Sequence, residues 1–144
     1  MKHGELYNLA YKVMMDAHKG QVDKLGAPYF EHPMVVASMV KDENAKVVAL
    51  LHDVVEDTKV TLLHLALMNF PQFIIEAVDA ISRRKDEQYF VYIERVKQNT
   101  LAKEVKIADL NHNLDPVRLS GMPEKGQISL RRRYNKALNI LQNS

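Results

Sequence analysis

The chain has 144 residues, and its 20 lysines and arginines against 18 aspartates and glutamates give a formal charge of +2. Charge this balanced argues against nucleic acid or a membrane surface as a partner, and it leaves the oligomeric state open. The absence of cysteine excludes disulfides, a thiolate nucleophile and cysteine-ligated zinc, and it suits a cytoplasmic location. The N-terminal residues lack the apolar core of a signal peptide, and no apolar run approaches the roughly 20 residues that span a membrane.

Hydrophobic periodicity predicts helices along nearly the whole chain and no strand. The first helix is indicated by apolar residues at three-and-four spacing, namely Leu6, Leu9, Ala10, Val13, Met14 and Ala17. The stretch "KDENAKVVALLHDVVED", residues 41–57, repeats the pattern as one continuous helix. Further helices are expected after Pro33, at Thr61 as N-cap, at Pro71, near Asp86, near Thr100 and near Glu124. The sequence therefore predicts an all-α protein, a single compact helical bundle over residues 1–144.

Most glycines and prolines fall in two segments between these helices. They are "KGQVDKLGAPY", residues 19–29, and "DPVRLSGMPEKG", residues 115–126. Such composition is typical of connecting loops, and loops often carry function. We therefore expect functional loops at both places and no domain boundary.

The segment "ALLHDVVEDT", residues 49–58, places one histidine and three carboxylates in an apolar helix. Four-residue spacing puts His52 with Glu56, and Asp53 with Asp57, in two neighbouring rows on one face. Buried carboxylates are costly without a partner, so these rows indicate a bound cation. A His-Asp pair alone is more often a surface ion pair or a helix cap.

Two further segments strengthen the metal interpretation. In "PYFEHPMVVA", His32 precedes a proline at the start of an expected helix. In "VKIADLNHNLD", Asp109 is followed three and four residues later by His112 and Asn113. The three segments, in this order, resemble the HD-domain metal-dependent phosphohydrolases, in particular the alarmone-hydrolase branch shared by bifunctional RelA/SpoT enzymes and small stand-alone hydrolases.

This resemblance implies a metal site and a reaction. His32, His52, Asp53 and Asp109 would ligate one divalent ion, which is manganese in the alarmone hydrolases. Two imidazoles and two carboxylates suit iron, zinc or cobalt as well, so ligand chemistry alone does not select the metal. The reaction of the branch removes the 3′-pyrophosphate of a guanosine polyphosphate, and the substrate is therefore expected to be a small nucleotide.

The resemblance also implies roles for residues beside the metal. Glu56 and Asp57 would orient or deprotonate the attacking water, with support of the metal ligands as their alternative role. Asn113 would contact the sugar or a phosphate, with a structural amide as its alternative. The other histidines are expected to have no metal role, namely His3, His18, His64 and His112.

The chain departs from the branch where the substrate is recognised. Asp23 stands where the alarmone hydrolases carry an arginine that stacks on guanine, and Lys24 keeps the following lysine as a candidate phosphate ligand. Leu110 replaces a basic residue, and Asp115 and Pro116 replace an Arg-Thr pair. A carboxylate at position 23 cannot stack on a base as a guanidinium does, and it would repel a polyphosphate. We therefore expect weak recognition of the base.

Two alternative functions stay open at this point. The first is another HD activity, such as a 5′-nucleotidase or a cyclic-nucleotide phosphodiesterase. The second is a metal-containing nucleotide-binding or sensor domain without turnover. Glu56 and Asp57 argue against the second, because binding alone does not require both.

Overall fold

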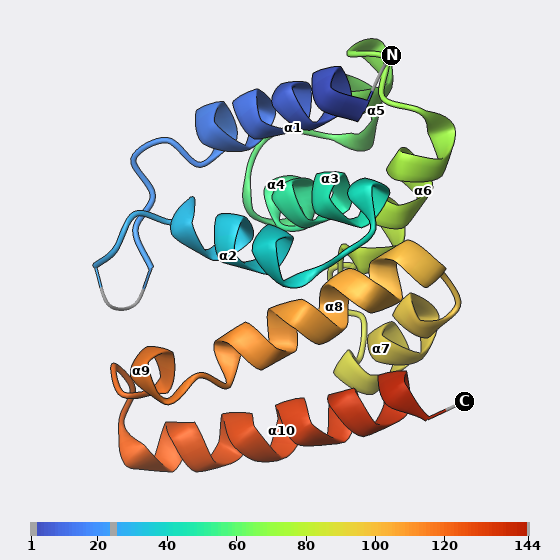
Figure 1. Ribbon diagram of the computed structural model, residues 1–144. Coiled ribbons are helices and arrows are strands. Elements are labelled where there is room, and N and C mark those ends of the chain that lie inside the picture. Colours follow the sequence, from blue (N-terminus) through green and yellow to red (C-terminus); the bar gives the residue numbers. More distant parts are fainter. Residues whose placement is uncertain (1–2, 24–25, 144) are drawn as a thin grey trace.

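Helix α3 (Glu43–Leu51) lies at the centre of the molecule, and α1, α2, α6 and α8 pack around it (Figure 1). The computed structural model describes residues 3–23 and 26–143. The remaining helices are α1 (His3–Ala17), α2 (Glu31–Met39), α4 (Val54–Asp57), α5 (Leu62–Leu67), α6 (Gln72–Ile81), α7 (Tyr89–Lys97), α8 (Thr100–Asn113), α9 (Pro116–Leu119) and α10 (Glu124–Gln142). Within the described ranges, the sole β-type pairing is an isolated bridge between Val22 and Pro28. The all-α prediction is confirmed.

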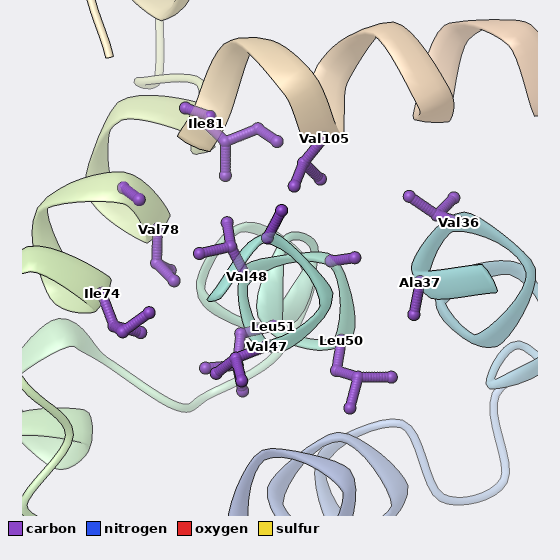
Figure 2. Close-up of a cluster of buried hydrophobic side chains, with 14 of the residues drawn as sticks. Val36, Ala37, Val47, Val48, Leu50, Leu51, Ile74, Val78, Ile81 and Val105 are labelled. Carbon is purple, nitrogen blue, oxygen red and sulfur yellow. The ribbon is translucent and has the colours of Figure 1, made fainter. Parts of the chain in front are cut away.

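Burial explains why α3 occupies the centre. Its residues 47–51 are fully buried aliphatic side chains, so this helix is apolar around its whole circumference and requires neighbours on every side. Figure 2 shows these neighbours, with Ile74 and Val78 of α6 on one side and Val36 and Ala37 of α2 on the other. Asp42 caps the start of α3, where its carboxylate accepts the N–H groups of residues 44 and 45 at 2.8 and 3.1 Å.

Several predicted helix starts agree with the structure. Thr61 is the N-cap of α5 and forms a capping box with His64. Helices α8 and α10 begin at Thr100 and Glu124, as expected. Helix α7 begins at Tyr89, three residues beyond Asp86, because Gln88 provides the cap by accepting the N–H of Val91. The short helix α9 was not predicted, since its segment reads as a loop.

The expected continuous helix over residues 41–57 is interrupted at His52 and Asp53, between α3 and α4. In an unbroken helix the carbonyl of Ala49 accepts the N–H of Asp53. Here that carbonyl accepts Nδ1–H of His52 at 2.6 Å and, weakly, the backbone N–H of His52 at 3.4 Å. The histidine side chain thus competes for the helical bond, and the turn it forms lies next to the candidate site.

No helix in the described ranges is long and apolar enough to cross a membrane.

Candidate metal centre and active site

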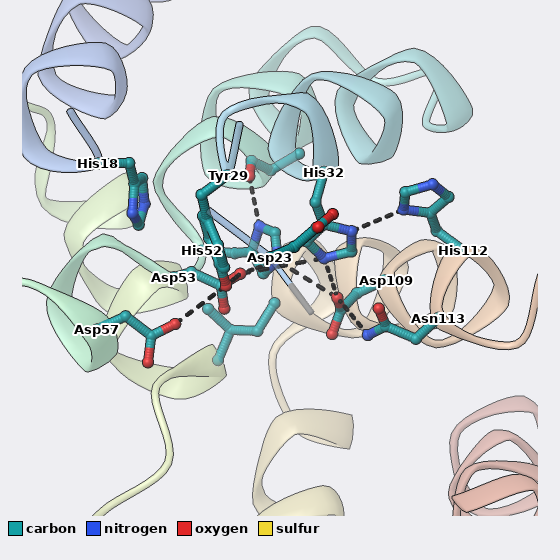
Figure 3. Close-up of polar contacts among 12 residues, drawn as sticks. His18, Asp23, Tyr29, His32, His52, Asp53, Asp57, Asp109, His112 and Asn113 are labelled. Carbon is teal, nitrogen blue, oxygen red and sulfur yellow. Dashed lines mark hydrogen bonds and ion pairs between the residues drawn. The ribbon is translucent and has the colours of Figure 1, made fainter. Parts of the chain in front are cut away.

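Three buried side chains from three helices converge on one point. His32 comes from the first turn of α2, His52 from the end of α3 and Asp109 from α8. Both imidazole Nε2 atoms face one carboxylate oxygen, with His32 at 2.7 Å and His52 at 3.4 Å from Asp109 Oδ1 (Figure 3). One ligand atom from each residue lies within 4.8 Å of the others, which suits a shared metal ion.

The hydrogen bonds of His52 fit metal ligation. Its Nδ1–H donates to the carbonyl of Ala49, so in the neutral ring, the form that binds metal, Nε2 carries the lone pair, and this atom points toward Asp109. Nε2 is buried and has no hydrogen-bond partner within the part of the chain that the structure describes. Burial lowers the pKa of His52, but the neighbouring Asp53 and Asp109 carboxylates outweigh it and hold this pKa well above its usual value. The site therefore favours an added positive charge.

Asp109 is oriented by partners on its own helix. Lys106, one turn earlier on α8, places Nζ 2.9 Å from Oδ2, while Asn113 Nδ2 donates to Oδ1 at 3.2 Å. Burial raises the pKa of Asp109, but Lys106 and the two histidines outweigh it and hold the pKa well below its usual range. Lys106 thus occupies Oδ2 and leaves Oδ1 facing the imidazoles. Lys106 was not among the expected site residues, although its i, i+3 spacing from Asp109 is visible in the sequence.

His112 supports the other imidazole. Its Nδ1 lies 2.6 Å from Nδ1 of His32, and the two rings stack with centroids 4.9 Å apart. Burial, together with the nearby His32 and Arg118, lowers the pKa of His112 to about 4. A neutral His112 can accept the Nδ1–H of His32, which directs Nε2 of His32 toward Asp109. His112 was expected to have no metal role, and this contact with His32 was not anticipated.

Asp53 lies at the edge of the cluster. Its Oδ2 is 3.0 Å from Nε2 of His52 and 4.0 Å from Nε2 of His32. Tyr29 places its hydroxyl 2.9 Å from this oxygen and 3.1 Å from Oδ2 of Asp57, so one phenol links the two carboxylates (Figure 3). That Asp53 is the fourth metal ligand remains a prediction. Its distances to the two imidazole nitrogens support it.

Glu56 and Asp57 flank the cluster on α4. Burial, with added repulsion from Asp53, raises the pKa of both carboxyl groups. Glu56 Oε2 accepts the backbone N–H of Arg83 at 3.1 Å, which anchors it from a second segment. A carboxylate with a raised pKa is a better proton acceptor near neutral pH. These features suit the predicted role in activating water.

Known proteins resemble this chain in sequence and in structure. The bifunctional (p)ppGpp synthase/hydrolase SpoT of Escherichia coli K12 is 33% identical over 120 residues, which cover 73% of this chain and 17% of that protein. The guanosine-3′,5′-bis(diphosphate) 3′-pyrophosphohydrolase of Haemophilus influenzae is 34% identical over 121 residues, covering 71% and 17%. This chain is a homologue of the SpoT/RelA hydrolase domain. No protein-family model matches it.

A solved structure of a metazoan orthologue of SpoT, described as hydrolysing ppGpp and playing a role in starvation responses, has the same fold. The TM-score is 0.79 at 23% identity, and the match covers 96% of this chain and 86% of the orthologue. The SpoT homologue spans 17% of the length of the two bacterial relatives above.

A pocket of about 310 Å³ adjoins the candidate metal centre. Tyr29 and Asn113 line it, and both also contact the site, Tyr29 through Asp53 and Asn113 through Asp109. A substrate that places a phosphate at the cluster can therefore place its remaining part in this pocket.

The departures from the alarmone hydrolases have structural explanations. Leu110 is buried in the core. Asp115 caps α9 by accepting the N–H of Val117 at 2.8 Å, and Pro116 occupies the first turn. Asp23, which was expected to repel an anionic substrate, pairs with Arg118 of α9 at 3.5 Å. Lys24, the predicted phosphate ligand, lies outside the described residues.

Proposed function

We propose that this chain is a metal-dependent phosphohydrolase that removes the 3′-pyrophosphate of a guanosine polyphosphate. The observation that carries the proposal is the convergence of His32, His52 and Asp109 on one buried point. The names of the bacterial relatives, which describe (p)ppGpp hydrolysis, support this substrate class. We also propose that residues 1–144 form one functional unit in the cytoplasm, acting on a small nucleotide without nucleic-acid or membrane partners.

His32, His52, Asp53 and Asp109 would hold the divalent ion, with Mn²⁺ as the proposed metal and iron, zinc or cobalt compatible with the same ligands. Such an ion lowers the pKa of a water molecule and offsets negative charge on phosphoryl oxygens. Lys106, through its 2.9 Å contact with Asp109, keeps this ligand in place.

Protein side chains would perform the proton transfers. Glu56 or Asp57 takes a proton from water as its oxygen attacks the 3′-phosphorus, and raised pKa values suit both for this task. The new P–O bond replaces the bond to the ribose 3′-oxygen, which leaves with a proton returned by the carboxyl group that took one from water. From guanosine tetraphosphate the products are pyrophosphate and guanosine 5′-diphosphate. Asn113, which lines the adjoining pocket, would contact the sugar or a phosphate, and Lys24 remains a proposed phosphate ligand.

Another HD nucleotide phosphatase is the second candidate. The Asp23–Arg118 pair supports this candidate, because the pair makes the pocket differ from that of the alarmone hydrolases. The experiment is to incubate the purified protein, with Mn²⁺ or with chelator, with guanosine tetraphosphate and a panel of mononucleotides and cyclic nucleotides. We expect Mn²⁺-dependent release of pyrophosphate from guanosine tetraphosphate. Release of orthophosphate from mononucleotides alone would favour the second candidate, and tight binding without turnover would favour a sensor.

A further inference from the structure

Arg118 is the one basic side chain among the described residues that line the pocket beside the metal centre. It comes from α9, whose start is fixed by the Asp115 cap and by Pro116. Its position therefore depends on the two residues that replace the Arg-Thr pair of the alarmone hydrolases. The remaining walls include Tyr29, Tyr134 and Leu119, which offer aromatic and aliphatic surface.

Both terminal nitrogens of Arg118 already have partners. Nη1 lies 3.5 Å from Oδ2 of Asp23, and Nη2 donates to Oδ1 of Asn113 at 3.1 Å. A guanidinium binds phosphate through a fork of parallel N–H bonds. The two contacts hold both terminal nitrogens in place and use two of the five N–H groups. Guanidinium faces stack on planar rings, and Arg118 lines the pocket in which such a ring would lie. The side chain is 23% exposed, so it is held in place but accessible.

Asp23 is itself fixed in its loop. Its Oδ1 accepts the N–H of Ala27 at 3.0 Å, while Oδ2 faces Arg118. The carboxylate is mostly buried, with 13% of its side chain exposed. It therefore neutralises and orients Arg118. A bound substrate would meet this ion pair and not an isolated negative charge.

Resting on the proposed function, we propose that Arg118 is the specificity-determining residue that stacks on the base of the nucleotide substrate, with Asp23 as its positioning residue. The aromatic and aliphatic walls exclude water from such a ring. This role predicts that Asp23 affects substrate binding in the opposite direction from the one expected from sequence. A merely repulsive carboxylate would weaken substrate binding, whereas a positioning carboxylate strengthens it.

The experiment compares KM and kcat for guanosine tetraphosphate in Arg118→Ala, Arg118→Lys and Asp23→Asn. Asn at position 23 retains an oxygen for the N–H of Ala27, so the loop keeps its hydrogen bond while Arg118 loses its anionic partner. We expect KM to rise about tenfold in Arg118→Ala, the scale of one stacking contact. Arg118→Lys should show a similar rise in KM, because lysine keeps the positive charge but lacks the planar guanidinium group. Asp23→Asn should also raise KM, and kcat should stay within about twofold in all three variants.

The double variant provides the decisive comparison. If Asp23 acts through Arg118, adding Asp23→Asn to Arg118→Ala should raise KM no further. Arg132→Ala, which removes an exposed arginine on α10, is the control and should leave KM unchanged. Circular dichroism and Mn²⁺ content should match the unmodified protein throughout.

The outcomes separate this inference from the proposed function. The stacking role is overturned if the protein is active and Asp23→Asn lowers KM, or if Arg118→Lys has the KM of the unmodified protein. Either result leaves the hydrolase proposal intact. An unmodified protein that cleaves no nucleotide overturns both.

Discussion

Lys106→Met tests how the candidate metal centre is held together. The substitution removes a cation 2.9 Å from Asp109 Oδ2 and keeps the aliphatic bulk of the side chain. The side chains of the pair are 13% and 6% exposed. At an effective dielectric constant of about 20, two unit charges at this separation attract by about 6 kcal/mol, an upper bound. Breaking a buried pair typically costs about 3 kcal/mol or more, since the other charge stays buried.

We therefore expect Lys106→Met to lower the free energy of unfolding by about 3 kcal/mol in chelator. With Mn²⁺ present the loss should be smaller, because an ion held by Asp109 supplies positive charge to the same carboxylate. Urea unfolding of both proteins, in chelator and in saturating Mn²⁺, measures this difference. Lys103→Met on the same helix is the control and should change stability by less than about 0.5 kcal/mol in either condition. Equal losses for Lys106→Met with and without Mn²⁺ would refute the coupling between Lys106 and the metal centre.

Three other predictions follow from the site and from the fold. His52→Ala should contain little divalent metal by elemental analysis, and retention of metal at the level of the unmodified protein would contradict its ligand role. Glu56→Gln and Asp57→Asn should retain metal while at least one loses about 10²-fold or more in turnover, so full activity in both would contradict their role as proton acceptors. Two-point hydrogen bonds from Arg95 lower the pKa of Glu87 to about 2 from the usual 4.5. A lowered folded-state pKa stabilises the protein above pH 4.5 and the contribution disappears as the pH falls toward 2. Glu87→Gln should thus cost about 1 kcal/mol at pH 7 and nothing near pH 2, and a cost that does not change with pH would exclude the ion pair as its cause.

Local sequence rules located the helices because their signals lie within a few residues. Thr61 caps α5, and α8 begins at Thr100, directly after the asparagine that caps it. The same rules failed at His52, where apolar periodicity continues through a break. A side-chain bond to the carbonyl of Ala49 causes that break, and periodicity contains no information about such a bond.

A bound cation was indicated by the cost of burying histidine and aspartate without a partner, and the resemblance to the HD-domain phosphohydrolases supplied the expected ligands. The supporting contacts of these ligands were harder to predict. The contact of Lys106 with Asp109 lies within α8 and follows their i, i+3 spacing, whereas the contact of His112 with His32 depends on how α2 faces α8. Arg118 and Asp23 are 95 residues apart in sequence, so only the folded chain reveals that they form a pair.

The central claim is tested most directly by the products formed from guanosine tetraphosphate in the presence of Mn²⁺. Chromatography of the reaction should show guanosine 5′-diphosphate and pyrophosphate in equal amounts. Formation of both should stop in chelator and in the His52→Ala variant. If the Mn²⁺-loaded protein leaves guanosine tetraphosphate intact, or forms these products equally well in chelator, the assignment of a metal-dependent 3′-pyrophosphohydrolase is contradicted.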